Sequence, residues 1–226
     1  MAKEIDLAVL RHSTAHVMAE AVLEMFPDAQ IAIGPAIENG FYYDFDLPRP
    51  LTDADLETIT KNMRKIINEG HDFVRKEVTR EEAREIFKNQ KYKLELLDAI
   101  PEGETVTIYN QGNFTDLCRG PHVANTKELC ADGFKLLSIA GAYWRGSEKN
   151  KMLTRIYATA WASKADLKAY LDHLADVEKR DHRKLGKELD LFSLHEEAGP
   201  GLVYWHPRGA RIRQIIEQFW REEHYK

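Results

Sequence analysis

The chain has 226 residues, of which 43% are hydrophobic and 31% charged, and its formal net charge is −5. This composition is that of a soluble globular protein with a sizeable core, and it gives no global sign of nucleic-acid binding, although a local basic stretch can still bind phosphates. Two cysteines, Cys118 and Cys130, exclude a disulfide framework, and no apolar run approaches the ~20 residues of a membrane span.

The amino terminus predicts a helix. It lacks a basic segment followed by an apolar run, so we expect no secretory signal and a reducing, cytoplasmic location. Apolar residues recur at spacings of three and four over residues 7–25, with Asp6 as N-cap and Pro27 as the stop. Two strands are expected next, over 30–33 and 40–46, separated by glycine, proline and asparagine.

Capping boxes mark the following two helices. Thr52 with Asp55 predicts the start of one helix, and Gly70 predicts its end. Residues 71–78 are typical of a strand, and the box TREE at 79–82 begins a second, shorter helix.

The sequence pattern changes over residues 93–162, where short strand-like runs are separated by glycine and proline. Strands and helices do not alternate as βα units, so we expect an α+β fold with antiparallel sheets and packed helices. The predicted strands of this segment are 105–109, 134–139 and 151–159.

A long helix and a new segment follow. Ser163 with Asp166 caps a helix that we expect to run to residue 187; its later part is charged on nearly all sides, as in helices that bridge domains. After it, an amphipathic helix is expected from about Ala210. We predict three parts: a domain over 1–162, a linker helix over 163–187, and the opening of another domain over 188–226.

Two short motifs carry the chemistry. His12 and His16 form HxxxH within the first helix, where residues four apart share one face. Cys118 and His122 form CxxxH, and the intervening Gly-Pro indicates a loop rather than a helix. Three imidazoles and a thiolate match a tetrahedral zinc site, and Asp116 lies beside the cysteine.

The same groups are also those of a hydrolytic site. Together with Asp116 and Lys93, they could position a water, take its proton and protonate a leaving oxygen. A lysine can stabilise a developing oxyanion. By its sequence context alone, however, Lys93 is better interpreted as a solvated lysine at a strand edge.

Five segments in order resemble bacterial threonyl-tRNA synthetase over essentially the whole chain. The segments are RHSTAH, AIGPAIENGFYYDFD, DLCRGPHV, AGAYWRG and KMLTRIYATAW. The resemblance implies an editing domain over 1–162, the linker helix over 163–187, and the start of a class II aminoacylation domain over 188–226. The family's ubiquitin-like N-terminal domain and its ATP-binding motifs have no counterpart, so we expect editing without aminoacylation.

The resemblance also supplies the substrate. Serine lacks one methyl group of threonine, and such a difference is worth only about 1–3 kcal/mol of discrimination in one pocket, so a second, hydrolytic site is the expected remedy. The implied activity is hydrolysis of seryl-tRNA(Thr), with the threonyl ester spared because its methyl does not fit.

Site residues are carried over from the matching motifs. His12 and Cys118 are expected to hold the terminal ribose and the seryl group. His122 and Lys93 would position or activate water, and Asp116 would recognise the seryl amine or hydroxyl. His16 completes the catalytic set, and the substrate-binding candidates are Tyr43, Arg119 and Trp144.

The partners implied are the acceptor end of tRNA(Thr) and the remainder of the synthetase, with no membrane and a monomeric chain. Basic residues expected to contact phosphates lie in the loop after Trp144 and on the linker helix. They are Arg145, Lys149, Lys151, Lys179, Arg180, Arg183, Lys184 and Lys187.

Three alternatives stay open. The resemblance implies hydrolysis with ordered water and no required cofactor, while zinc on His12, His16, Cys118 and His122 is the competing interpretation. A second hypothesis is a zinc-binding module that docks tRNA without catalysis. A third is a free-standing editing protein of the alanyl type, against which the extension over 163–226 argues.

Overall fold

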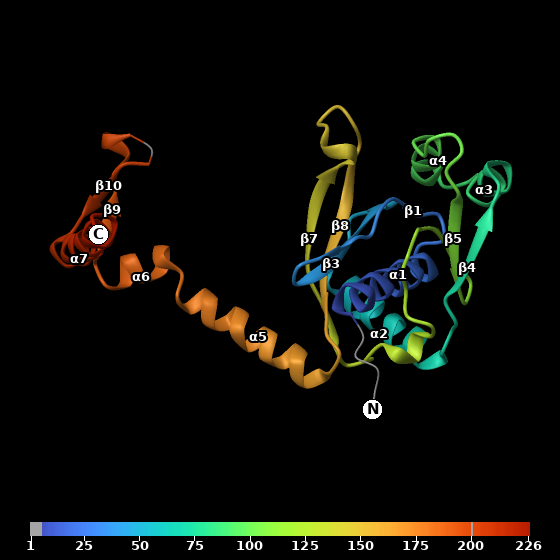
Figure 1. Cartoon of the computed structure of the whole chain (residues 1–226), viewed down its shortest axis with the longest axis horizontal. Helices are drawn as coiled ribbons and strands as arrows, with labels where there is room; N and C mark the ends of the chain where they lie inside the picture. The colour runs from blue at the N-terminus through green and yellow to red at the C-terminus, as the bar shows by residue number, and fades with distance from the viewer. Residues whose placement is uncertain (1–5, 200) are drawn as a thin grey trace. The chain divides into compact units, whose positions relative to one another are not determined.

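The computed structural model describes residues 6–199 and 201–226 (Figure 1). The chain divides into two compact units, residues 1–168 and residues 169–226, which we call the site unit and the tail unit. The boundary falls within helix α5 (Lys164–Lys179). Helices and antiparallel strands build both units, so the predicted α+β class is confirmed.

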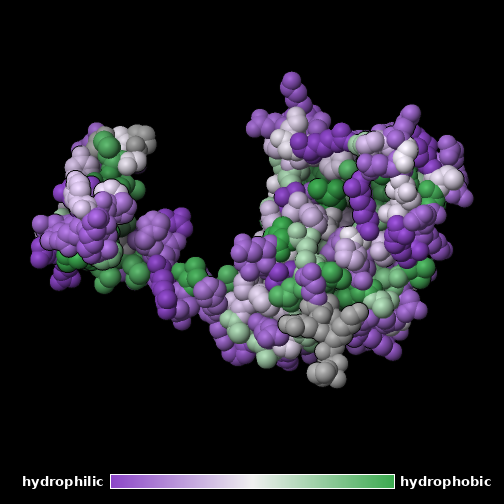
Figure 2. Space-filling model, viewed as in Figure 1, coloured by the Kyte–Doolittle hydropathy of each residue, from purple (hydrophilic) through white to green (hydrophobic). Residues whose placement is uncertain are grey.

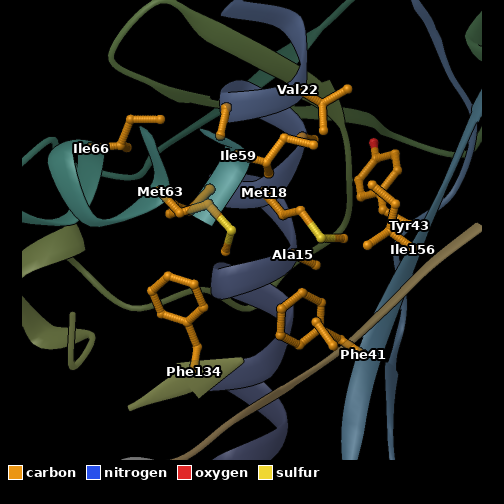
Figure 3. Packing of buried hydrophobic residues seen from close by; sticks show 14 of the residues in the cluster. Ala15, Met18, Val22, Phe41, Tyr43, Ile59, Met63, Ile66, Phe134 and Ile156 are labelled. Carbon is orange, nitrogen blue, oxygen red and sulfur yellow. The ribbon is translucent and has the colours of Figure 1, made fainter. Parts of the chain in front are cut away.

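Helix α1 (Leu7–Met25) is the centre of the site unit. Asp6 caps it as predicted, its side chain accepting from the Ala8 amide at 2.8 Å. Twelve of its residues are buried, so the helix is enclosed on most sides. Figure 3 shows Met18 packed near Ile59 and Met63 of helix α2 (Asp53–Glu69) on one side and Phe41 of β3 on the other.

A five-stranded antiparallel sheet packs against α1. Its order is β1-β3-β8-β7, and β2 pairs with the first two residues of β3. The strands are β1 (Gln30–Ile31), β2 (Ala36–Ile37), β3 (Gly40–Asp46), β7 (Phe134–Tyr143) and β8 (Met152–Ala160).

A three-stranded sheet lies on the other side of α1 (Figure 1), with the order β4-β5-β6. Its strands are β4 (Val74–Val78), β5 (Val106–Gln111) and β6 (Phe114–Leu117). Phe114 joins the main core, and Gln111 donates to Glu20 of α1 at 2.9 Å, so this sheet is tied directly to the central helix.

The capping boxes are confirmed, and one helix was missed. Thr52 caps α2 and Thr79 caps α3 (Arg80–Ile86), each with a reciprocal side-chain bond from the third residue of the helix. Residues 91–98, at the start of the segment expected to be strand-rich, form helix α4 (Lys91–Asp98). Its amino end is held by Gln30, whose side chain accepts from the Lys91 amide at 3.0 Å.

The tail unit continues α5 into α6 (His182–Glu188), then β9 (Phe192–Leu194), β10 (Val203–Trp205) and α7 (Pro207–His224). The helix expected over 163–187 is thus present in two pieces, because the Asp181 side chain accepts from the Arg183 amide at 2.8 Å and starts α6 anew. Helix α7 begins at Pro207, three residues before the predicted Ala210. Across the described residues, no helix combines the length and apolarity needed to cross a membrane.

Candidate active site

The two histidine motifs are held by different elements of the site unit. His12 and His16 lie on α1, with ring centroids 5.2 Å apart. Cys118 follows the end of β6, and the loop from it to His122 turns back towards α1. Gly120 makes this turn possible, since its φ is 72° and a Cβ there would come within 2.4 Å of the Tyr109 hydroxyl.

The loop brings the two motifs together. The Cys118 sulfur lies 3.4 Å from Nε2 of His12 and 3.3 Å from Nε2 of His122. One ligand atom from each of the four residues, His16 included, lies within 4.8 Å of the other three. The convergence expected from residues more than a hundred positions apart is therefore observed.

Asp116 anchors a buried polar chain beside this cluster. The Tyr43 hydroxyl donates to its Oδ2 at 2.6 Å, and Nε2 of His16 lies 3.5 Å from the same oxygen. The Lys93 ammonium contacts Oδ1 and donates to the Tyr43 hydroxyl at 3.1 Å. The Lys93 side chain is only 2% exposed, so its interpretation as a solvated strand-edge lysine is wrong. Helix α4 places the Lys93 side chain in the core.

Burial sets the protonation of the cluster. Loss of solvation lowers the pKa of His12 and lowers the pKa of His16 and His122 much further, with the neighbouring imidazoles adding to the effect on the latter two. Burial raises the pKa of the Cys118 thiol to about 12. Near neutral pH the three imidazoles are thus uncharged and the thiol is protonated.

The cluster opens onto a cavity of about 550 Å³. His12, His16, Cys118, Lys93 and Asp116 are polar members of its lining. Much of the remaining lining is apolar, and its larger members are Val9, Ile33, Pro35, Leu96, Leu117 and Pro121. A cavity of this size with an apolar lining and a few polar groups is typical of a small-ligand site.

The other substrate-binding candidates occupy three different settings. Tyr43 is fully buried and does not line the cavity, but its hydroxyl donates a hydrogen bond to Asp116. Arg119 lies on the cavity rim, paired with Glu104 at 2.8 Å. Trp144 is buried away from the cavity lining: its ring packs on Tyr92 and its Nε1 donates to Glu95 at 2.7 Å. In this structure Trp144 is a core residue.

Four of the eight predicted phosphate contacts have carboxylate partners among the described residues. Arg145 lies 4.0 Å from Glu95, and Lys151 lies 2.7 Å from Asp46. On the charged helices, Arg180 and Arg183 pair with Asp176 and Asp181, each at 2.6 Å. Lys149, Lys179, Lys184 and Lys187 are exposed.

Sequence reasoning missed two residues that shape the site. Ser13 is fully buried and contacts the His122 ring, although it stands inside the HSTAH motif. Gly34 lines the cavity, and a Cβ there would lie 2.0 Å from the Tyr43 ring. The Gly34-Pro35 pair had signalled only a turn. The glycine is in fact required for the close approach of Tyr43.

The donor set fits a divalent metal in kind. Imidazole and thiolate are the ligands that zinc takes, and neighbouring ligands of a tetrahedral zinc lie ~3.5 Å apart, close to the two contacts of Cys118. Nδ1 of His16 is buried without a hydrogen-bond partner among the described residues, while Nε2 faces Asp116. A carboxylate behind a ligating histidine is the usual outer-shell arrangement.

Comparisons with known proteins agree with the sequence motifs. Residues 106–157 match the family described as the threonyl and alanyl tRNA synthetase second additional domain. The chain is 58% identical over 224 residues to the threonine–tRNA ligase of Borrelia hermsii, covering 99% of this chain and 38% of that protein.

Two further relatives extend the comparison. The threonine–tRNA ligase of Dehalococcoides mccartyi is 60% identical over 221 residues, which are 98% of this chain and 38% of that protein. That of Magnetococcus marinus is 56% identical over 96% of this chain and 34% of its own length. The chain thus spans well under half the length of these curated relatives. The predicted resemblance is confirmed: over nearly its whole length the chain is similar to part of the threonine–tRNA ligases, and residues 106–157 match their second additional domain.

Proposed function

We propose that the site unit is an editing hydrolase that cleaves seryl-tRNA(Thr) and spares threonyl-tRNA(Thr). The observation that carries this proposal is the shared cavity: His12, His16 and Cys118 of the cluster and the buried Lys93–Asp116 pair line the same space of about 550 Å³. Similarity to threonine–tRNA ligases supports a tRNA ester as the substrate class.

The chemistry is direct hydrolysis. Water adds to the ester carbonyl, the bond to the ribose oxygen breaks, and a proton passes to that oxygen. A neutral imidazole is the form that accepts a proton from water, and the moderately lowered pKa of His12 keeps that ring neutral. The pKa of His122 is lowered much further, which makes this ring a weak base, so its part in the proposal is to position the water by a hydrogen bond. The Cys118 thiol, with its pKa raised to about 12, is a poor nucleophile, so a thioester intermediate is not part of the proposal.

The charged pair organises the aminoacyl group. Asp116 is open to the cavity and is oriented by Tyr43, so its carboxylate is placed to receive the α-amino group or the hydroxyl of serine. The Lys93 ammonium is held beside it, where it can stabilise negative charge on the carbonyl oxygen. His12 and Cys118 lie on the same side and would contact the terminal ribose.

Discrimination would come from the apolar wall. The substrate to be destroyed is the smaller one, so exclusion of the threonine methyl, rather than its recognition, must supply the difference. A clash with a rigid wall exceeds the roughly 1–3 kcal/mol that one methyl contributes by favourable contact. In this proposal the acceptor end of tRNA(Thr) and the remainder of a synthetase are the partners of the chain, and the exposed lysines Lys149 and Lys184 are candidate phosphate contacts.

The donor set favours one competing function, a metal-binding module that docks tRNA without catalysis. His12, His16, Cys118 and His122 would hold the ion. A bound zinc would act as a Lewis acid and would keep the thiol deprotonated. Binding of about one zinc per chain with metal-dependent melting, together with tRNA binding but no deacylation, would favour this alternative.

Alanine substitutions test the assignment of the site. Cys118→Ala and His12→Ala should each slow deacylation of seryl-tRNA(Thr) at least tenfold, since each removes a polar group from the cavity, as judged by single-turnover rates. The matched control is His173→Ala, which removes an exposed imidazole on α5 and should leave the rate unchanged. Parental rates in both cluster variants would show that the site is elsewhere.

A further inference from the structure

Ser13 lies at the junction of the two histidine motifs. It sits on α1 between His12 and His16 in sequence, and its side chain is completely buried. Three groups surround its hydroxyl: the Val9 carbonyl at 2.8 Å, the Val123 amide at 3.0 Å and Nδ1 of His122 at 3.1 Å. The serine therefore joins the central helix to the loop that carries Cys118 and His122.

A hydroxyl has one proton to donate and can accept two hydrogen bonds. The Val9 carbonyl can only accept, and the Val123 amide can only donate. Nδ1 of His122 can do either, depending on where the ring proton resides. One assignment satisfies all three contacts at once: the hydroxyl donates to Val9 and accepts from both Val123 and a protonated Nδ1 of His122.

The distances agree with this assignment. Hydroxyl donors usually lie about 2.7–2.8 Å from a carbonyl oxygen, whereas N–H donors lie about 2.9–3.0 Å from theirs, with a range extending to about 3.2 Å. The short contact is the one to Val9, and the two longer ones are those to nitrogen. If the hydroxyl donated to His122 instead, no proton would lie between the Ser13 hydroxyl and the Val9 carbonyl, although these two oxygens are only 2.8 Å apart.

We infer that Ser13 is a positioning residue that holds His122 as the Nδ1–H tautomer, so that the lone pair of Nε2 points at the Cys118 sulfur 3.3 Å away. The ring cannot easily turn to exchange its nitrogens. Phe73 stacks on it at a centroid distance of 4.9 Å, and Tyr109 packs edge-on at 4.5 Å.

In the proposed hydrolase, this tautomer makes Nε2 of His122 a hydrogen-bond acceptor within the cluster. Nε2 of His122 lies 3.3 Å from the Cys118 sulfur, and only its unprotonated form can accept a hydrogen bond from the thiol or from water. The inference rests on the proposed function for its catalytic meaning. The tautomer itself can be measured without any substrate.

The test is ¹⁵N NMR of the histidine side chains in the whole chain, kept with a metal chelator. The His122 signal is assigned by its loss in His122→Gln. We expect Nδ1 to carry the proton in the parent chain, and Ser13→Ala to shift His122 away from that tautomer. Thr14→Val is the matched control, because it removes a buried hydroxyl that also bonds the carbonyl four residues back, at 2.8 Å, but does not contact His122.

Deacylation adds a second readout. Ser13→Ala should slow hydrolysis of seryl-tRNA(Thr) by roughly tenfold, as loss of an outer-shell partner does elsewhere, while Thr14→Val should not. A parent chain with His122 protonated at Nε2 overturns the inference, even where Ser13→Ala fails to fold. So does an unchanged tautomer in a folded Ser13→Ala. If the parent chain shows the expected tautomer but no deacylation, the proposed function fails and the inference on Ser13 stands.

Discussion

The two units each contain a histidine cluster with a carboxylate, and the two differ in burial. In the site unit, Asp116 and His16 are 4% and 2% exposed. In the tail unit, Asp190 lies 2.7 Å from Nδ1 of His206, and Nε2 of the same ring lies 2.8 Å from Ser193. The side chains of Asp190 and His206 are nevertheless 79% and 31% exposed. The histidine–aspartate contact is shorter in the tail unit, 2.7 Å against 3.5 Å between His16 and Asp116, so residue types and short contacts do not by themselves mark an active site.

Burial changes what the same groups do. Desolvation drives the pKa of His16 far down, which fixes the imidazole as an uncharged acceptor. The large apolar side chains show the same contrast. Those of the site unit gather largely in three buried clusters, whereas Trp205, Phe219 and Trp220 of the tail unit are 43%, 65% and 58% exposed. Figure 2 shows hydrophobic residues, in green, on the surface of the tail unit. The site unit alone therefore provides the dry, rigid surroundings that the proposed chemistry needs.

The largest effect is expected from matched substitutions of the two aspartates. Asp116→Asn leaves the buried Lys93 ammonium without its anion, which should lower the free energy of unfolding by about 3–5 kcal/mol. Asp190→Asn, at an exposed residue with φ of 53° that asparagine tolerates, should change it by less than about 0.5 kcal/mol. Urea denaturation measures both, and equal costs would contradict the contrast in burial.

A smaller effect is expected from adding a methyl group beside the site. The Cβ of Gly34→Ala would lie 2.0 Å from the Tyr43 ring, so the ring must shift and its bond to Asp116 must weaken, at a cost of about 1–3 kcal/mol. In Gly141→Ala, the nearest atom is the sulfur of the half-exposed Met152, which can move aside. Thermal melting should separate the two variants, and a Gly34→Ala chain as stable as Gly141→Ala would show that Tyr43 is not tightly held.

The smallest expected effects are two changes in stability, at Glu20 and at Glu217, that have opposite signs at pH 7. Burial raises the pKa of Glu20, so the folded chain holds this proton more tightly than the unfolded chain. The carboxyl then contributes fully below about pH 4.5, and this contribution is lost as pH rises through the folded pKa. Glu20→Gln should therefore stabilise the chain at pH 7 by up to about 1 kcal/mol, with no gain at pH 4.

The tail unit supplies the opposite case. The hydrogen bond from Arg213 lowers the pKa of Glu217, so its ionised form is the stabilising one. Glu217→Gln should slightly lower the melting temperature at pH 7 and lose this effect as pH falls below the ordinary value of 4.5. Melting curves across pH for both variants check the signs, and a destabilised Glu20→Gln at pH 7 would refute the burial argument.

Local signals predicted much of the fold. The caps at Asp6, Thr52 and Thr79 act on neighbouring amides, so the sequence within one turn determines them. The HxxxH spacing likewise required only helical geometry. The meeting of α1 with the loop of Cys118 depends on tertiary packing, and it was expected only because both motifs supply ligands of the same kind.

The remaining features depend on contacts between distant segments. Lys93 looked like a surface lysine because nothing near it in sequence reveals its two partners in the core. Asp116 neutralises its charge, and the Tyr43 hydroxyl accepts a hydrogen bond from it. Trp144 was a substrate-binding candidate, yet Tyr92 and Glu95 of α4 cover it. The break at Asp181 was hidden because its cap competes with an otherwise continuous run of helix formers.

In the proposed function, the cavity of the site unit hydrolyses the smaller ester. The decisive experiment compares the hydrolysis rates of seryl-tRNA(Thr) and threonyl-tRNA(Thr) by the purified chain, with and without a chelator. We expect the seryl ester to be hydrolysed at least about tenfold faster, because the additional methyl group is excluded from the cavity. Equal rates for the two esters, or no hydrolysis of either one in both conditions, would contradict it.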